Sequence, residues 1–303
     1  SGRRRWLVSK HPLNSQLSTL NPQSPMHAIG IDIGGTRIKA VLIDKDGNVL
    51  YHNYQSTEDN AEMAWRQTIM DIVLDIKNRY AEKEIVLGIS APGLPNEDNT
   101  AIACMPGRMQ GLENFNWQSN LKLPACVLND AVAAMVAEAG FGAARKKSHA
   151  VLVTLGTGVG GAILIDGKPY QGAFNKAGHI GHMVIDDEGD CDVTGMPGSL
   201  EECIGECTIE KRTGGRFHNT RELLDAMKNG DDYAKNVWLK SVRQLAIGLS
   251  SITNILSPET IVLGGGITEA GADLFDPLNE YMARYEWRTG GRKAEIVKAV
   301  FGD

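Results

Sequence analysis

Residues 29–43 read Ile-Gly-Ile-Asp-Ile-Gly-Gly-Thr-Arg-Ile-Lys-Ala-Val-Leu-Ile, a glycine-rich turn between two apolar stretches that favour strands. A second turn of this kind occupies residues 151–165, which read Val-Leu-Val-Thr-Leu-Gly-Thr-Gly-Val-Gly-Gly-Ala-Ile-Leu-Ile. Glycine lets backbone N–H groups approach an anion closely, so such turns suit phosphate binding. Either turn alone is commonly just a tight hairpin. Two of them, each with a hydroxyl and the first with an acidic residue, indicate a nucleotide held between two related lobes.

Length, composition and charge favour a soluble protein and argue against nucleic-acid-binding and membrane-spanning classes. The chain has 303 residues, more than one typical hydrophobic core supports, so two domains are expected. Its composition, 42% hydrophobic and 22% charged, is that of a soluble globular protein, and the net charge of -6 argues against a nucleic-acid-binding surface. An odd number of cysteines, 5, fits a reducing cytoplasm better than a disulfide framework. No apolar run approaches the roughly 18 residues of a membrane span. We therefore expect a cytoplasmic protein without a membrane partner.

The first 25 residues differ from the remainder. Residues 14–25 are rich in Ser, Asn, Gln and Pro and offer little to bury, which predicts a disordered leader over residues 1–25. A basic arm that binds nucleic acid, suggested by the three arginines at positions 3–5, is the alternative. From Met26 onward the pattern is regular, and we expect an N-terminal domain at 26–139 and a C-terminal domain at 140–303.

The expected elements of the two halves follow a common order. In the first half we expect strands at 27–33, 37–43, 49–56, 84–90 and 125–128, with helices at 60–82 and 131–140. In the second half we expect strands at 149–155 and 161–165, a strand from 260 that enters a glycine turn, and helices at 200–213, at 232–256 and from 270. Corresponding turns in corresponding places predict an internal duplication with a cleft between the halves.

Three glycine motifs together resemble the phosphate-1, phosphate-2 and adenosine motifs of the actin/hexokinase/Hsp70 ATPase fold. They read Asp-Ile-Gly-Gly-Thr at 32–36, Thr-Leu-Gly-Thr-Gly at 154–158 and Leu-Gly-Gly-Gly at 263–266. Within that fold the chain resembles the ROK family (repressors, open reading frames and kinases) through residues 156–181 and the segments Leu-Asn-Asp-Ala at 128–131, Gly-His-Ile-Gly-His at 178–182 and Gly-Ser-Leu-Glu at 198–201. The resemblance covers Met26 to nearly the C-terminus. It implies an α/β protein with two actin-like (ribonuclease H-like) domains that close over ATP and a sugar.

The nucleotide is expected at the glycine turns. Phosphoryl transfer needs phosphate clamps and Mg²⁺, and Asp32 is the expected carboxylate for Mg²⁺, partly through water. A structural aspartate at a strand end is the alternative for Asp32, and a strand-to-helix turn without a ligand is the alternative for the third motif. Lys39 lies within a strand, so its contact with phosphate stays open. The expected nucleotide-binding residues are Asp32, Gly34, Gly35, Thr36, Lys39, Thr154, Gly156, Thr157, Gly158, Gly264, Gly265 and Gly266.

Asn129 and Asp130 stand between an expected strand and an expected helix, where an aspartate commonly caps the helix. By resemblance Asp130 is the general base that accepts the proton of the sugar hydroxyl, and Asn129 binds a neighbouring hydroxyl. One residue could serve as both base and cap. The further residues expected to bind the sugar, by their match to family positions, are Gly93, His179, His182 and Glu201. A histidine outside such a motif would more often be a core or surface residue.

The sugar pocket departs from the family pattern at two positions. His179 stands where ROK kinases carry the Glu of a Glu-x-Gly-His motif, and a neutral imidazole, with one donor and one acceptor, cannot reproduce a carboxylate that only accepts. The family's Pro-Asn at the rim of the pocket reads Pro106-Gly107 here. We therefore expect weak glucose binding, or a preferred sugar that differs near carbon 1 or 2. The affinity should vary between about pH 6 and 8 as His179 titrates, unless burial shifts its pKa.

A third departure concerns zinc. Many ROK proteins hold a structural zinc ion with a His and the three cysteines of Cys-x-Cys-Gly-x-x-Gly-Cys. Residues 191–199 read Cys-Asp-Val-Thr-Gly-Met-Pro-Gly-Ser, so one cysteine survives, whereas a closed zinc site needs four ligands. We expect no structural zinc. A rearranged site made of His182, Cys191, Cys203 and Cys207 is the alternative.

The retained Asp32, Asn129 and Asp130 favour an ATP-dependent sugar kinase, glucokinase-like, that acts on a hexose or a hexose derivative. A catalytically impaired sugar-binding protein or sensor is the alternative, favoured by His179 and Gly107. A DNA-binding repressor would need a helix-turn-helix, which the short leader is not expected to supply. The expected ligands are therefore ATP, Mg²⁺ and a small-molecule sugar, with no nucleic acid, and the resemblance implies a homodimer.

Overall fold

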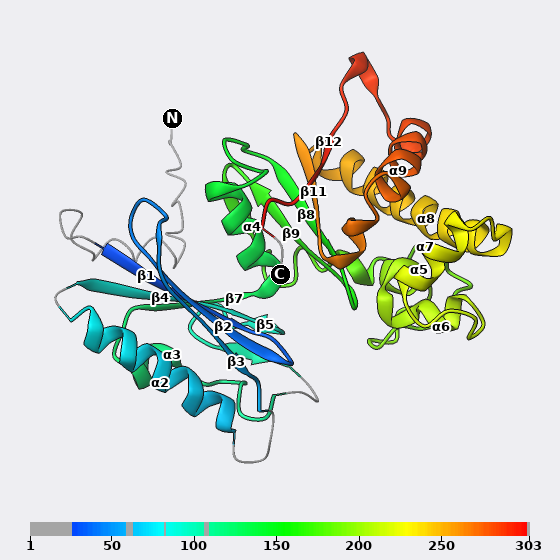
Figure 1. Cartoon of the computed structure of the whole chain (residues 1–303). Helices are drawn as coiled ribbons and strands as arrows, with labels where there is room; N and C mark the ends of the chain where they lie inside the picture. Colours follow the sequence, from blue (N-terminus) through cyan, green and yellow to red (C-terminus); the bar gives the residue numbers. More distant parts are fainter. Residues whose placement is uncertain (1–25, 59–62, 82, 106–108, 302–303) are drawn as a thin grey trace, which may run out of the picture. The chain divides into compact units, whose positions relative to one another are not determined.

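The computed structural model describes residues 26–58, 63–81, 83–105 and 109–301. The predicted leader and the departure at Gly107 lie outside the described residues. The chain divides into two compact units, and the division falls between Ala133 and Ala134, inside helix α4 (Asp130–Phe141). Each unit is built around one five-stranded sheet (Figure 1).

The sheet of the first unit has the strand order β3-β2-β1-β4-β7. These strands are β1 (Met26–Ile33), β2 (Arg37–Ile43), β3 (Val49–Ser56), β4 (Glu84–Ala91) and β7 (Ala125–Asn129), and two short strands, β5 (Leu94–Pro95) and β6 (Ile102–Cys104), pair apart from them. β1, β2 and β3 pair antiparallel, whereas β4 runs parallel to β1 and β7 runs parallel to β4. The strands expected in this half are confirmed, because alternating apolar residues and tight turns fix them locally.

Helices α2 (Ala64–Arg79) and α3 (Trp117–Leu121) cover one face of this sheet (Figure 1). The rings of Trp65 and Trp117 lie 6.2 Å apart and join the two helices in the core. The helix expected at 60–82 is confirmed over the residues of α2, and parts of its expected ends lie outside the described residues.

The sheet of the second unit has the order β10-β9-β8-β11-β12. Its strands are β8 (Ala150–Leu155), β9 (Val159–Ile165), β10 (Lys168–Tyr170), β11 (Thr260–Gly264) and β12 (Glu295–Lys298). β8, β9 and β10 pair antiparallel, and β11 and β12 continue from β8 in parallel. Both sheets thus consist of an antiparallel three-stranded meander whose first strand is extended by two parallel strands, which is what an internal duplication predicts.

The helices of the second unit pack mainly around α8 (Asp232–Leu256), which matches the expected helix and buries Trp238 and Leu245 in the core of this unit. The expected helix at 200–213 is wrong as a single element: it breaks at Gly205, whose ψ of 146° is not helical. The pieces are α5 (Leu200–Ile204), η2 (Glu206–Thr208) and α6 (Ile209–Arg212). The remaining helices are η1 (Ile180–His182), α7 (Thr220–Lys228), η3 (Gly266–Ala270), α9 (Ala272–Tyr285) and η4 (Thr289–Gly291). In the part of the chain described here, no helix is both long and apolar enough to cross a membrane.

Candidate active site

The first glycine turn joins β1 to β2 and is closed by a hydrogen bond of 2.9 Å from Gly34 N to Arg37 O. A β-carbon at Gly34 would lie 2.9 Å from that carbonyl oxygen, so the turn requires glycine there. Thr57 braces the turn, since its N–H donates to Thr36 O at 3.0 Å and its hydroxyl donates to Gly34 O at 2.7 Å. Gly35 and Thr36 are exposed, which is compatible with their predicted role in binding phosphate.

Asp32 precedes this turn and has two polar neighbours. Its Oδ1 accepts a hydrogen bond of 2.7 Å from the hydroxyl of Ser90, and its Oδ2 lies 3.8 Å from Lys39 Nζ. Mg²⁺ is usually bound by one or two carboxylates together with substrate phosphates and water, so the half-buried Asp32 carboxylate fits such an ion. Sequence reasoning missed Ser90. The parallel register, which pairs Asp32 with Ser90 across β1 and β4, is the signal that could have found it.

Asn129 ends β7 and is held by two hydrogen bonds. Its Nδ2 donates to Gly93 O at 3.1 Å, and its Oδ1 accepts from Ala131 N at 3.0 Å. Gly93 has a φ of 95°, and a β-carbon there would lie 2.6 Å from Cys104 O, so only glycine fits this position. The backbone of Gly93 and the amide of Asn129 therefore form one ordered corner at the end of the strand.

Asp130 opens helix α4, and its Oδ1 accepts a hydrogen bond of 2.7 Å from Ala131 N. This contact is to the N–H of the next residue, whereas Asn129, the residue before α4, accepts from the same N–H at 3.0 Å as an N-cap does. The helix is thus capped by Asn129, and the capping role considered for Asp130 is not formed. Desolvation by burial raises the pKa of the Asp130 carboxyl, and the charge of Asp32 raises it further, while hydrogen bonds from Ala131 and Asn129 oppose the rise. The residue nevertheless keeps access to solvent. A carboxylate with a raised pKa and an open approach suits a general base.

The second glycine turn joins β8 to β9 and is closed by a hydrogen bond of 3.0 Å from Gly156 N to Gly158 O. Two backbone bonds from the segment after α5 hold the turn: Glu206 N donates to Gly156 O at 3.0 Å, and Cys207 N donates to Thr157 O at 2.8 Å. The carbonyl groups of the turn are therefore engaged within the protein, and Thr157 is exposed.

Glu201 contacts the same turn from α5. Its Oε2 accepts a hydrogen bond of 2.9 Å from Val159 N, and a β-carbon at Gly158 would collide with that oxygen. The residue predicted to bind sugar hydroxyls thus also orders the turn predicted to bind phosphate.

The third glycine motif follows β11, where Gly264 pairs with Thr154 of β8. Gly265 has φ 86° and ψ 164°, a region restricted almost entirely to glycine, and a β-carbon there would lie 2.8 Å from Leu155 N. A β-carbon at Gly266 would meet nothing within 4 Å. The third motif therefore lies against the strand end that leads into the second turn.

His179 precedes η1 and His182 is its last residue, and their rings stack with planes 12° apart and centroids 6.4 Å apart. Burial lowers the pKa of His179, and the charges of His182 and Lys176 lower it further. The exception reserved for burial therefore applies: the titration of His179 moves to lower pH, because a desolvated site disfavours the imidazolium cation. His182 Nδ1 lies 2.9 Å from Oδ2 of Asp192.

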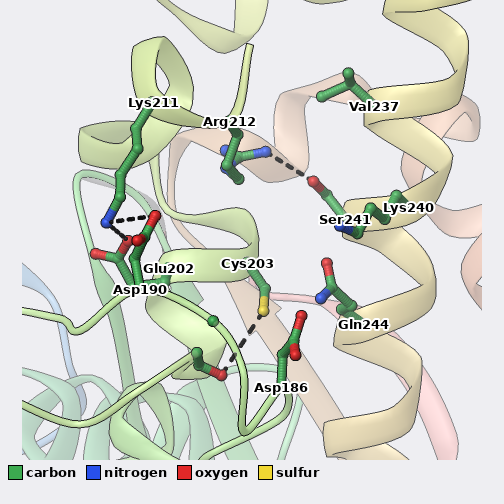
Figure 2. Close-up of a pocket in the computed structure, with 12 residues that line it drawn as sticks. Asp186, Asp190, Glu202, Cys203, Lys211, Arg212, Val237, Lys240, Ser241 and Gln244 are labelled. Atoms are coloured by element: carbon green, nitrogen blue, oxygen red, sulfur yellow. Dashed lines mark hydrogen bonds and ion pairs between the residues drawn. The ribbon is translucent and has the colours of Figure 1, made fainter. Parts of the chain in front are cut away.

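The loop at 191–199 holds no cluster of thiols. Cys191 and Cys207 are exposed, whereas Cys203 is buried. The Cys203 sulfur lies 4.0 Å from Gly198 O. Cys203 is one of the residues that line a cavity of about 230 Å³, whose lining is drawn in Figure 2. Among the described residues, no three His, Cys, Asp or Glu side chains are grouped so that they could hold a metal ion. His182 and these three cysteines are therefore not grouped as a metal site in this structure, and the absence of structural zinc stays a prediction.

The predicted site residues fall into two groups, one in each unit. The first unit carries Asp32, Gly34, Gly35, Thr36, Lys39, Gly93, Asn129 and Asp130, at adjoining carboxyl ends of the parallel strands β1, β4 and β7. The second unit carries Thr154, Gly156, Thr157, Gly158, His179, His182, Glu201, Gly264, Gly265 and Gly266. η1 packs there against β9 and α5, and the third glycine motif lies against the end of β8. The roles of these residues toward ligands remain predictions.

A model of the ROK family matches residues 28–303. The chain belongs to the ROK family. An uncharacterised relative from Clostridium perfringens is 33% identical over 258 residues, which cover 84% of this chain and 85% of that protein. The glucokinase of Thermotoga maritima is 29% identical over 286 residues, which cover 85% of this chain and 87% of the glucokinase.

Solved structures of ROK proteins share the fold. The ROK hexokinase from Thermus thermophilus superposes with a TM-score of 0.78 at 27% identity, over 90% of this chain and 93% of the hexokinase. A ROK glucokinase from Streptomyces griseus, in complex with glucose and AMPPNP, superposes with a TM-score of 0.70 at 25% identity, over 91% of this chain and 95% of the glucokinase. The expected α/β fold with actin-like domains is thereby confirmed.

Proposed function

We propose that this ROK protein is an ATP-dependent sugar kinase that transfers the γ-phosphoryl group of ATP to a hydroxyl of a hexose or hexose derivative. The observation that carries the proposal is the corner at the end of β7, where Asn129 is fixed by Gly93 and Asp130 carries a carboxyl of raised pKa near Asp32. The similarity to the Thermotoga glucokinase and to the Thermus hexokinase supports the reaction class.

Asp130 is the proposed general base. Its carboxylate accepts the proton of the acceptor hydroxyl while that oxygen forms a bond to the γ-phosphorus of ATP, and the bond from the γ-phosphorus to the bridging oxygen breaks to release ADP. Asn129 has its amide nitrogen directed to Gly93 O and its amide oxygen to Ala131 N, so its side chain is fixed beside the base. A positioned base of this type contributes about 10²–10⁴ in rate.

The glycine turns are the proposed phosphate clamps, with Gly34 to Thr36 in the first unit and Gly156 to Gly158 in the second. When bound, Mg²⁺ neutralises charge on the phosphates during transfer. Asp32 is the carboxylate that would hold the ion, and Ser90 orients it through the hydrogen bond of 2.7 Å. The AMPPNP complex of the Streptomyces griseus relative supports ATP as the donor.

His179 supports a second candidate, a sugar-binding protein or sensor of low catalytic activity, because it replaces an acceptor-only carboxylate in the expected pocket. The two candidates differ in one measurable respect. A kinase consumes ATP stoichiometrically with sugar phosphate formed, whereas a sensor binds the sugar without turnover.

The test is a panel of glucose, other aldohexoses and hexose derivatives, assayed with ATP and Mg²⁺ for ADP release, with the product position assigned by NMR. We expect ATP-dependent phosphorylation of at least one sugar. Sugar binding by calorimetry without turnover for any member of the panel would favour the sensor, and neither binding nor turnover would contradict both candidates.

A further inference from the structure

A single buried carboxylate organises the loop at 190–199. The side chain of Asp192 is 0% exposed. Its Oδ1 accepts three hydrogen bonds, from Thr194 N at 2.8 Å, from the Thr194 hydroxyl at 2.7 Å and from Met196 N at 3.1 Å. Its Oδ2 faces His182 Nδ1 at 2.9 Å. Four donors thus converge on one side chain within the loop where the family resemblance leads one to expect a metal ion.

The ionised form of this carboxyl is strongly favoured. Burial alone raises the pKa of Asp192, but hydrogen bonds from Thr194, His182, Met196 and Ser199 outweigh it and hold the pKa well below its usual range. A buried carboxylate without donors would be costly, and the four donors above, together with Ser199, compensate that cost. Asp192 is therefore an acceptor on both oxygens.

The loop backbone closes around this carboxylate. Asp192 N donates to Met196 O at 2.9 Å, and Gly195 N donates to Asp192 O at 2.9 Å. Asp190, at the start of the loop, has an exposed carboxylate that lies 3.3 Å from Lys211 Nζ. Both residues line the cavity drawn in Figure 2. The donor set does not fit a structural zinc ion, because hydroxyl, amide and imidazole N–H groups point at a carboxylate and no thiolate is among them.

We propose that the Asp192 carboxylate takes the place of a metal ion at the centre of the 190–199 loop and holds His182 with Nδ1 as the donor and Nε2 as the acceptor. Asp192 is thus a positioning residue. It orders the loop through Oδ1 and sets the tautomer of His182 through Oδ2. The consequence for sugar binding rests on the proposed function, in which the Nε2 of His182 accepts a hydrogen bond from a sugar hydroxyl.

The substitutions Asp192→Asn and Asp192→Ala separate the ordering of the loop from the setting of the His182 tautomer. In Asp192→Asn the amide oxygen is expected to remain at the Oδ1 position, where three donors converge, which places the NH₂ group against His182 Nδ1. That NH₂ group can only donate, so His182 must accept at Nδ1 and carry its proton on Nε2. Asp192→Ala removes both sets of bonds. Asp190→Asn is the matched control, because Asp190 is two residues away and its side chain is 72% exposed.

Three measurements test the proposal on the full chain. First, metal analysis should find no stoichiometric zinc, and EDTA should leave the melting temperature of the wild type unchanged. Second, Asp192→Ala should lower the melting temperature by at least about 4 °C, whereas Asp192→Asn and Asp190→Asn should lower it less. Third, ¹⁵N NMR should show His182 protonated on Nδ1 in the wild type at pH 8 and on Nε2 in Asp192→Asn.

The kinetic consequence is a roughly tenfold to hundredfold rise in the KM for sugar in Asp192→Asn, with a smaller change in kcat. One zinc ion per chain whose removal lowers the melting temperature would overturn the proposal. An unchanged His182 tautomer in Asp192→Asn, or a wild-type melting temperature in Asp192→Ala, would also overturn it. The tautomer and the melting temperature are measured without turnover, so they decide this proposal even if no sugar is phosphorylated.

Discussion

The Glu201 carboxylate accepts a hydrogen bond of 2.9 Å from Val159 N, at the end of the second glycine turn. The same side chain is proposed to bind sugar hydroxyls. If that role holds, Glu201 connects the expected sugar pocket with the turn proposed as a phosphate clamp inside the second unit. The absence of a side chain at Gly158 leaves room for its carboxylate. Loss of this carboxylate should weaken the binding of both ATP and sugar. Loss of its charge alone should weaken only the binding of sugar.

We predict that Glu201→Ala weakens both ATP and sugar binding, by roughly tenfold for ATP, because a hydrogen bond from a backbone N–H to a charged group is lost and the turn loosens. Glu201→Gln keeps an acceptor for Val159 N, so ATP affinity should stay near that of the wild type while sugar affinity falls. Calorimetric dissociation constants check both. The control is Glu202→Ala, which removes a neighbouring carboxylate that accepts a hydrogen bond from Lys211. Equal losses of ATP affinity in Glu201→Ala and Glu202→Ala would refute the connection between Glu201 and the second glycine turn.

We predict that Gly265→Ala destabilises the protein by about 1–3 kcal/mol or more and weakens nucleotide binding. Its φ of 86° and ψ of 164° are costly for alanine, and the methyl group would collide with the backbone of Leu155. Gly266→Ala is the matched control, since a methyl group there meets nothing within 4 Å. Denaturant unfolding of both variants checks this. Similar stability of the two variants would show that the packing of Gly265 on β8 is not as described.

We predict that sugar affinity is constant from pH 7 to 8 and changes only as the pH falls below about 6.5, the ordinary value for histidine. Burial lowers the pKa of His179, so the ring is neutral at pH 7 and becomes charged only at lower pH. His179→Glu should restore an acceptor-only group and improve glucose affinity by roughly tenfold to hundredfold. Dissociation constants measured from pH 5 to 8 check both. Tight, pH-independent glucose binding by the wild type, unimproved in His179→Glu, would contradict this description of the pocket.

We also predict that turnover falls at acidic pH with an apparent pKa above the ordinary aspartate value of about 3.9. Burial and the charge of Asp32 raise the pKa of Asp130, so the base becomes protonated, and inactive, at a higher pH than a free aspartate would. The profile of kcat/KM against pH for the preferred sugar checks this prediction. An acid limb at or below the ordinary value would argue that Asp130 is not the group that titrates.

The sequence was sufficient for the strands and the glycine turns because their signals are local. The alternation of apolar residues in 27–33 and 37–43, and the glycines at 34 and 35, fix β1, β2 and their turn without reference to distant residues. The same holds for the long amphipathic helix α8. The shared topology of the two sheets then followed from the order of the elements.

Other features depend on contacts between distant segments, which no local pattern encodes. The helix expected at 200–213 breaks at Gly205, where the backbone of Glu206 turns to donate to Gly156 O. Ser90 became visible only through the parallel register of β1 and β4. Asp192 has the sequence appearance of an ordinary loop aspartate, and only the closed loop shows that it is buried among four donors.

The assignment of Asp130 as the base is the central claim, and Asp130→Asn tests it most directly. An amide oxygen can still accept the bond from Ala131 N, and Asn129 Oδ1 still accepts from the same N–H as the cap, so the start of α4 is preserved while the proton acceptor is lost. Single-turnover rates and calorimetric dissociation constants for ATP and sugar should be measured together, with the exposed Asp98→Asn as control. We predict that the rate falls by about 10²–10⁴ with both dissociation constants nearly unchanged. A rate within a few-fold of the wild type would contradict the account.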